Sequence, residues 1–241
     1  MSGEMALNWP VEMSHHATGY EVGSIWREAR MPNTHEIAAL VWGDLPTWMP
    51  TPIRPAVEWP WPQVRLHPGL VVPGIGGDRP PAFVAPVYGR RSRGPATTLA
   101  VAHRSRDLTR PADPHTESTV LRGEGSGFTL RRGDPLGGTI ILTAGLEAWL
   151  WWSMMSIRPV WATTRWGDLS EVDLEGVTTV LLVPDRWRRR DGIDATTDML
   201  SRRYAGRVRV EPIWTPEEAG RWGLLNPAHV ALRPLYGRDG W

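Results

Sequence analysis

The clearest chemistry in this sequence belongs to an arginine-rich segment that directly follows an apolar run at 177–183. The segment places four arginines around one tryptophan: Arg186, Arg188, Arg189 and Arg190, with Trp187. Guanidinium groups bind phosphate and an indole stacks on a base, so the segment could bind nucleic acid. A solvated, charged loop before a helix explains the same residues, and the sequence leaves both interpretations open.

A second position where chemistry is expected is uncharged. The apolar run after Gly138 stops at Thr143, Ala144 and Gly145, and a helix-forming stretch begins at Leu146. This order predicts a buried strand, a tight turn and a helix, which together open an α/β layer. Sites in such sheets lie at the carboxyl ends of the strands. The residues expected there carry no acid or base.

The spacing of apolar residues also predicts helices and strands before and after this strand, turn and helix. Helices are predicted from Glu21 to Met31, after Asn33 (its cap, with Glu36 three residues on), and from Leu146 to Met155. Another is predicted with Ile193, Thr197, Leu200 and Tyr204 on one face. Strands are predicted at 83–88, 98–103, 128–130, 160–164, 177–183 and 207–214. Strands that alternate with helices in the second half predict an α/β fold with a mostly parallel sheet.

Two long segments are predicted to lack regular structure. Residues 44–62 are rich in proline and tryptophan, so they cannot join a central strand and read as an extended spacer. Residues 107–127 are polar and read as an exposed loop.

Composition narrows the class of protein. The 241 residues include no cysteine, which excludes disulfides and thiol catalysis, and all 27 basic residues are arginine. A coding bias explains the missing lysine at least as well as selection for phosphate contacts does. The net charge of +1 requires that any nucleic-acid surface be local. We find no signal-peptide pattern and no apolar run of about 20 residues, and therefore expect a cytoplasmic protein without a membrane partner.

Several short motifs occur in an order that resembles a known family. They are Ser24–Arg30, Arg65-Leu66-His67-Pro68, Pro81–Val87, Val101–Arg104, Gly137-Gly138-Thr139, Ala144–Glu147 and Leu182–Asp185. The series resembles the Toprim domain of primase-like proteins from phages, plasmids and other mobile elements, together with the small domain that precedes it there. The resemblance covers residues 21–226 and rests on the order of the motifs.

The resemblance implies metal-assisted phosphoryl transfer. In that family a glutamate after the first strand is a general acid or base, and an Asp-x-Asp pair after a later strand binds Mg²⁺. The glutamate position is Ala144 here. The Asp-x-Asp position reads Asp185-Arg186-Trp187, so one aspartate remains. We therefore expect a Toprim-like domain whose catalytic motifs are degenerate and which needs no cofactor.

An active enzyme remains the alternative. Glu147 matches the family's second glutamate and, with Asp185, forms the candidate catalytic pair. Asp185 and Asp191 would be the metal ligands if a Mg²⁺ site persists.

The division expected along the chain has four parts. Residues 1–62 form an N-terminal helical segment and spacer, 63–135 a small β-rich domain, 136–226 the Toprim-like domain and 227–241 a tail. Three functions are considered: a degenerate primase-like protein that binds nucleic acid or a replication partner, an active Mg²⁺-dependent primase or nuclease, and a phage accessory module that binds a protein through its tryptophans.

Overall fold

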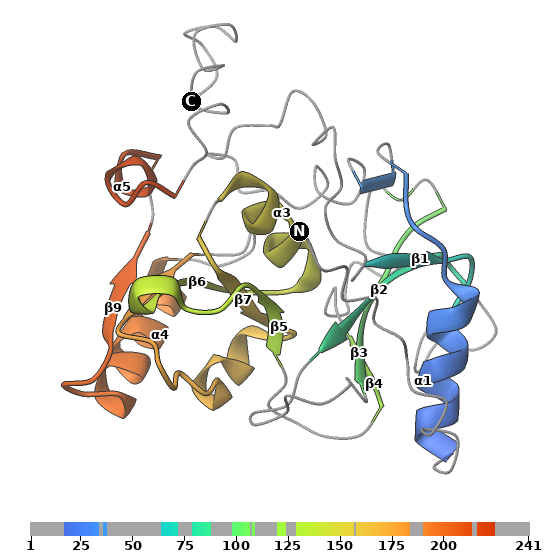
Figure 1. Cartoon of the computed structure of the whole chain (residues 1–241), viewed down its shortest axis with the longest axis horizontal. Coiled ribbons are helices and arrows are strands. Elements are labelled where there is room, and N and C mark those ends of the chain that lie inside the picture. The colour runs from blue at the N-terminus through green and yellow to red at the C-terminus, as the bar shows by residue number, and fades with distance from the viewer. Residues whose placement is uncertain are drawn as a thin grey trace, which may run out of the picture.

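The fold is described here from a computed structural model. It describes residues 17–33, 36–37, 64–71, 79–87, 98–106, 108, 120–123, 129–156, 158–183, 190–213 and 216–224. Within these ranges the chain forms two β-sheets with helices packed around and between them (Figure 1).

The first sheet is antiparallel and has four strands in chain order. They are β1 (Arg65–His67), β2 (Ala82–Val87), β3 (Thr98–His103) and β4 (Val120–Gly123). Every residue of β2 and β3 is buried, because both faces of the sheet are covered. Helix α1 (Ala17–Glu28) covers one face, where Val22 and Trp26 share an apolar cluster with Val84 and Val101.

The second sheet has five strands in the order β5-β7-β6-β8-β9. They are β5 (Thr129–Arg132), β6 (Thr139–Ala144), β7 (Val160–Thr163), β8 (Thr179–Leu182) and β9 (Arg209–Pro212). The last four are parallel to one another, and β5 runs antiparallel beside β7. The observed fold is therefore α/β with a mostly parallel sheet. Strand β5, which the sequence division groups with the small domain, hydrogen-bonds into this sheet.

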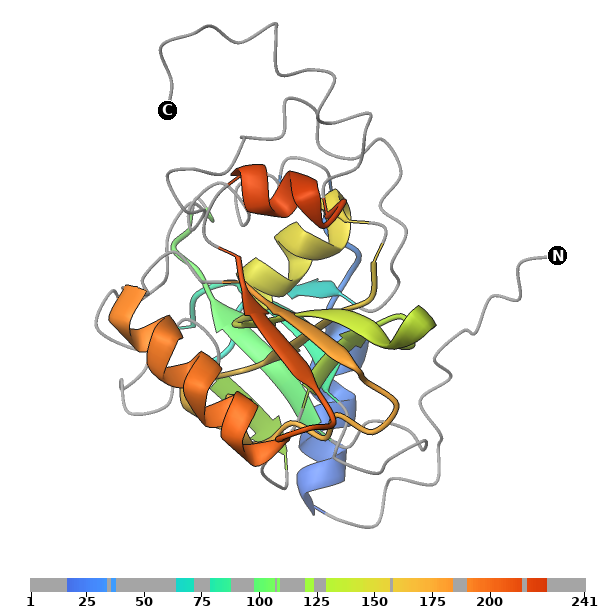
Figure 2. The ribbon, with the colours of Figure 1, turned by 90° about the vertical axis from the view of Figure 1, so that its left-hand side faces the viewer.

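Helices cover opposite faces of the second sheet (Figure 2). Helix α4 (Arg190–Arg203) lies on one face, where Ile193 and Leu200 are fully buried against β6 and β8. Helix α3 (Leu146–Met155) and the short α5 (Pro216–Arg221) lie on the other. Two 3₁₀ turns, η2 (Leu136–Gly138) and η3 (Trp166–Glu171), connect strands.

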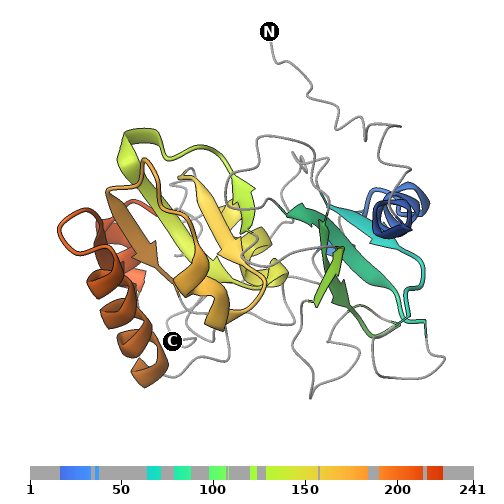
Figure 3. The ribbon, with the colours of Figure 1, turned by 90° about the horizontal axis from the view of Figure 1, so that it is seen from below.

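Helix α3 packs between the two sheets and joins their cores. Its residues share one apolar cluster with Phe83 and Ala102 of the first sheet and with Ile141 and Ala162 of the second (Figure 3). A helix that is apolar on all sides must be buried on all sides, and the sequence LEAWLWWSMM meets that description. Its three tryptophans are at most 1% exposed. The tryptophans of this helix therefore belong to the core between helix and sheets.

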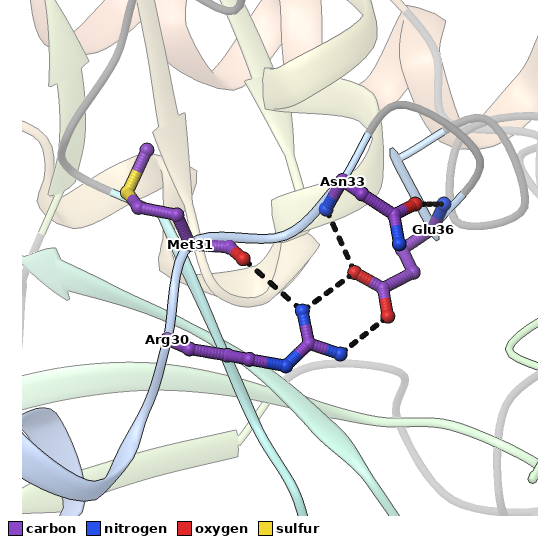
Figure 4. Close-up of polar contacts among 4 residues, drawn as sticks. All are labelled: Arg30, Met31, Asn33 and Glu36. Carbon is purple, nitrogen blue, oxygen red and sulfur yellow. Dashed lines mark hydrogen bonds and ion pairs between the residues drawn. The ribbon is translucent and has the colours of Figure 1, made fainter.

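The segment after α1 is fixed by a small polar cluster around Glu36 (Figure 4). The backbone N–H of Glu36 donates to Asn33 Oδ1 at 3.0 Å, and the Asn33 N–H donates back to Glu36 Oε2 at 2.7 Å. This is the capping box that the sequence predicts. Arg30 donates two further bonds to the Glu36 carboxylate, and this pairing lowers the pKa of Glu36 below its usual range. The backbone of Arg30 also pairs with Leu66 of β1, so the cluster ties the chain to the first sheet.

Most predicted elements are confirmed and two are corrected. The helix over 146–155 has the predicted bounds, and the predicted strands correspond to β2, β3, β5, β7, β8 and β9. Strand β4 lies inside 107–127, which the sequence predicted to be loop, and β1 was not predicted as a strand. Both are short and gain their structure from pairing with β3 and β2, which a local pattern cannot reveal. The predicted 44–62 spacer lies outside the described residues. Among those described, no helix is long and apolar enough to cross a membrane.

The tryptophans of α3 yield a first prediction. The Trp149 indole N–H donates to the carbonyl of Val160 at 3.1 Å, whereas the equally buried Trp151 N–H has no hydrogen-bond partner among the described residues. Trp149→Phe removes this hydrogen bond and leaves the Val160 carbonyl without the indole donor. The substitution should therefore lower the free energy of unfolding by about 1–2 kcal/mol more than Trp151→Phe does. Urea unfolding of both variants measures the difference. Equal losses would mean that the bond contributes nothing net.

Candidate functional site

The carboxyl edge of the five-stranded sheet is where its topology places a site. Helix α3 leaves β6 on one face of the sheet, and α4 follows the adjacent β8 on the other face. Ligands bind in open α/β sheets at this kind of switch point, outside the carboxyl ends of the strands. We call the ends of β6, β7 and β8 the rim: Thr143, Ala144 and Gly145, then Thr163 and Thr164, then Val183.

Ala144 at the rim is packed among apolar side chains. It is 3% exposed and shares an apolar cluster with Trp166 of η3 and Ile193 of α4. The Trp166 indole N–H donates to Thr196 Oγ1 at 2.7 Å, which holds η3 against α4. A carboxylate at position 144 would enter this cluster. Ala144, which the resemblance matches to the Toprim glutamate, is therefore part of the core.

The turn at the rim requires glycine. Gly145 has φ 86° and ψ 150°, a backbone conformation that residues with a Cβ rarely adopt. Its N–H donates to the Thr163 carbonyl at 2.8 Å and its carbonyl accepts from Trp149 N at 3.1 Å, so the turn joins β6, β7 and α3. No side chain caps the start of α3.

Three threonines supply the hydroxyl groups of the rim. Thr163 Oγ1 donates to the Arg165 carbonyl at 2.6 Å. Thr143 is fully buried, and its hydroxyl has no hydrogen-bond partner in the part of the chain that is described. Thr164 is 5% exposed. These buried groups are neither strong bases nor strong metal ligands.

Glu147, the remaining acid near the rim, is paired with an arginine of the first sheet. Arg104 Nη1 lies 3.3 Å from Glu147 Oε1, and the two side chains are 0% and 5% exposed. The Arg104 Nε–H donates to the Leu108 carbonyl at 3.2 Å, and its backbone N–H donates to Pro81 O at 2.8 Å. The charge of Glu147 is thus committed to a contact between the sheets. Its assignment as a catalytic residue stays a prediction.

The described acids do not fit the Mg²⁺ site that the Toprim resemblance implies. Position 144 has no carboxylate, and Glu147 is bound by Arg104. Mg²⁺ needs near-octahedral oxygen ligands, commonly from one or two carboxylates. No group of three His, Asp or Glu side chains suited to a metal ion occurs among the described residues. We therefore derive no step through a metal.

The other predicted site residues lie at the edge of what is described or beyond it. Residues 184–189, which include Asp185, Arg186, Trp187, Arg188 and Arg189, are outside the described residues. Arg190 and Asp191 are the first two residues of α4, and only their backbone is described. In the sequence, residues 184–189 lie between Val183 at the rim and the start of α4.

Sequence reasoning did not assign a role to Arg104. The motif Val101–Arg104 was used only as a landmark of the resemblance. One signal in the sequence could have predicted this role: Arg104 directly follows β3, a strand whose residues are all buried. An arginine in such a place is expected to be buried too, and a buried guanidinium group needs a buried partner.

Comparisons with known proteins give one match. No protein-family model and no curated protein matches the chain. The crystal structure of the Aquifex aeolicus primase (zinc-binding and RNA polymerase domains) matches with a TM-score of 0.40 and 18% sequence identity. The match covers 69% of this chain and 43% of that one, so this chain corresponds to less than half of the primase structure. The chain thus has a primase-like structural neighbour, and a likeness of this extent does not establish a shared function.

The buried pair yields a second prediction. Arg104→Met leaves the Glu147 carboxylate buried without this cation, which should cost about 3–5 kcal/mol of unfolding free energy. The double variant Arg104→Met/Glu147→Leu replaces the pair with apolar groups and should recover most of that loss. Chemical denaturation of the two singles and the double completes a thermodynamic cycle. If the double variant is as unstable as the sum of the singles, the two side chains do not interact.

The packing of Ala144 yields a third prediction. Ala144→Glu restores the family's residue but places a carboxylate in an apolar cluster, so we expect a loss of about 3 kcal/mol or more. The matched control is Ala148→Glu, because Ala148 is partly exposed in the first turn of α3, where a negative charge is favourable. Thermal unfolding compares the two. A stable Ala144→Glu protein that binds Mg²⁺ would contradict the interpretation of the rim.

Proposed function

We propose that this chain is a Toprim-like, primase-related protein of a phage, plasmid or other mobile element that has lost its metal chemistry and binds nucleic acid at the rim. The support from the fold is a parallel sheet in the order β7-β6-β8-β9, with a switch point between β6 and β8. The support from the sequence is the order of the family's motifs around that point.

The observation that carries the proposal concerns Ala144 and Glu147, the two positions that the resemblance matches to glutamates of the Toprim family. Ala144 is buried with Trp166 and Ile193, and Glu147 is bound to Arg104. The catalysis that the resemblance implies requires carboxylates that can reach a substrate or cation. Binding does not require one, so the same rim serves binding better than catalysis.

The arginine segment supplies the binding chemistry in this proposal. It starts three residues after Val183, which lies at the rim, and its last residue, Arg190, is the first residue of α4. Arg186, Arg188 and Arg189 would contact phosphates, and Trp187 would stack on a base. A replication protein is the alternative partner, since arginine and tryptophan also form the centres of protein interfaces.

A salt titration tests the proposal and is our fourth prediction. Binding of a fluorescein-labelled single-stranded DNA is measured by anisotropy at several salt concentrations, in EDTA and in Mg²⁺. We expect binding in EDTA, so that no metal ion is required, and we expect Arg186→Gln/Arg188→Gln/Arg189→Gln to reduce the slope of log K against log salt by about 2, at roughly 0.7 per contact.

Three exposed arginines away from the rim provide the matched control. Arg27→Gln/Arg79→Gln/Arg106→Gln removes the same charge and should leave the slope unchanged. DNA turnover in Mg²⁺ that disappears in Asp185→Ala would instead identify an enzyme. A wild-type protein that binds no DNA but captures a replication protein would replace nucleic acid with a protein partner.

A further inference from the structure

Four exposed arginines gather at the opposite edge of the five-stranded sheet, where α4 ends and β9 begins. We name them the arginine ridge: Arg202 and Arg203 in the last turn of α4, Arg207 in the turn, and Arg209 at the start of β9. Residues 202–210 contain no acid. The macrodipole of α4 accounts for positive charge in its last turn, but Arg207 and Arg209 lie beyond the helix.

The charge of the ridge is only partly neutralised. Arg202 lies 3.7 Å from Asp198, but both side chains are more than two-thirds exposed, and such pairs are weak. Arg209 contacts Glu211. In the described part of the chain, no carboxylate pairs with Arg203 or Arg207. Positive charge therefore remains available in the middle of the ridge.

Aromatic rings border the ridge on both faces of the sheet. The Arg203 guanidinium carbon lies 5.7 Å from the ring centroid of Tyr204, and that of Arg209 lies 5.7 Å from Trp222. The Tyr204 hydroxyl donates to the Val172 carbonyl, and the backbone of Trp222 is held by two N–H groups of Arg158 at 2.9 and 3.1 Å. Both rings are partly exposed. Partly exposed aromatic rings beside arginines are the elements of a stacking platform for bases.

The ridge is separate from the rim. Helix α4 begins after β8 reaches the rim and ends where β9 starts, and its 14 residues span roughly 20 Å. Figure 2 shows α4 running along the sheet between these two ends.

We infer that the arginine ridge binds the phosphate backbone of a single-stranded nucleic acid, with Tyr204 and Trp222 as flanking base contacts. The inference shares the class of ligand with the proposed function, but it uses residues at the other end of α4. It assigns binding to a surface on which none of the motifs of the Toprim resemblance lies.

The test compares ridge variants with matched arginines in the same anisotropy titration, which is our fifth prediction. Arg203→Gln/Arg207→Gln should lower the slope of log K against log salt by about 1.4, at roughly 0.7 per contact for single strands. Arg203→Lys/Arg207→Lys keeps both charges and should retain the wild-type slope. The control Arg27→Gln/Arg106→Gln should also retain it, and circular dichroism checks that each variant is folded.

Parallel measurement of the rim variant separates the two proposals. A slope that falls in the ridge variant and not in its control supports the ridge. A slope that falls only in the Arg186→Gln/Arg188→Gln/Arg189→Gln variant overturns the ridge and leaves the proposed function standing. A slope that falls only in the ridge variant supports the ridge and overturns binding at the rim. A wild-type protein that binds no oligonucleotide at low salt overturns both.

Discussion

The ion pair between Arg104 and Glu147 is a polar constraint on how α3 lies between the two sheets. The two side chains are 0% and 5% exposed, and a buried charge is costly unless it is paired. Arg104 directly follows a strand of the first sheet, and Glu147 lies in the first turn of the helix that opens the second. The apolar residues of α3 are buried against both sheets, and the ion pair joins the first turn of the helix to the end of β3.

Around Gly145 the backbone and the neighbouring side chains have separate roles. The glycine makes the turn between strand β6 and helix α3. Ala144 before the turn packs with Trp166 and Ile193, and Glu147 after it pairs with Arg104. The shape of the turn depends on the glycine, whereas any chemistry there depends on the residues beside it, so one fold can support different functions.

Local patterns predicted the elements whose residues carry their own signal. The predicted bounds of helix α3 match the observed ones, because its apolar run starts directly after a glycine turn. Strand β8 was predicted because its sequence is apolar on both faces. Strand β4 was missed because four residues gain their structure from a partner far along the chain. The capping box between Asn33 and Glu36 was predicted from spacing. The partner of Glu147 was not, because it is 43 residues away and reaches the helix only when the sheets pack together.

The outer strand β9 has a consequence for how this protein avoids self-association. Among the described residues it is an edge strand, and Arg209 and Ile213 donate their N–H groups inward to the carbonyls of Thr178 and Leu182. By alternation, position 212 faces outward, and the proline there has no N–H to offer a further strand. A proline on an edge strand blocks the template that another chain would need to extend the sheet. Pro212 therefore removes one hydrogen-bond donor from the outer edge of β9, where a further strand would pair.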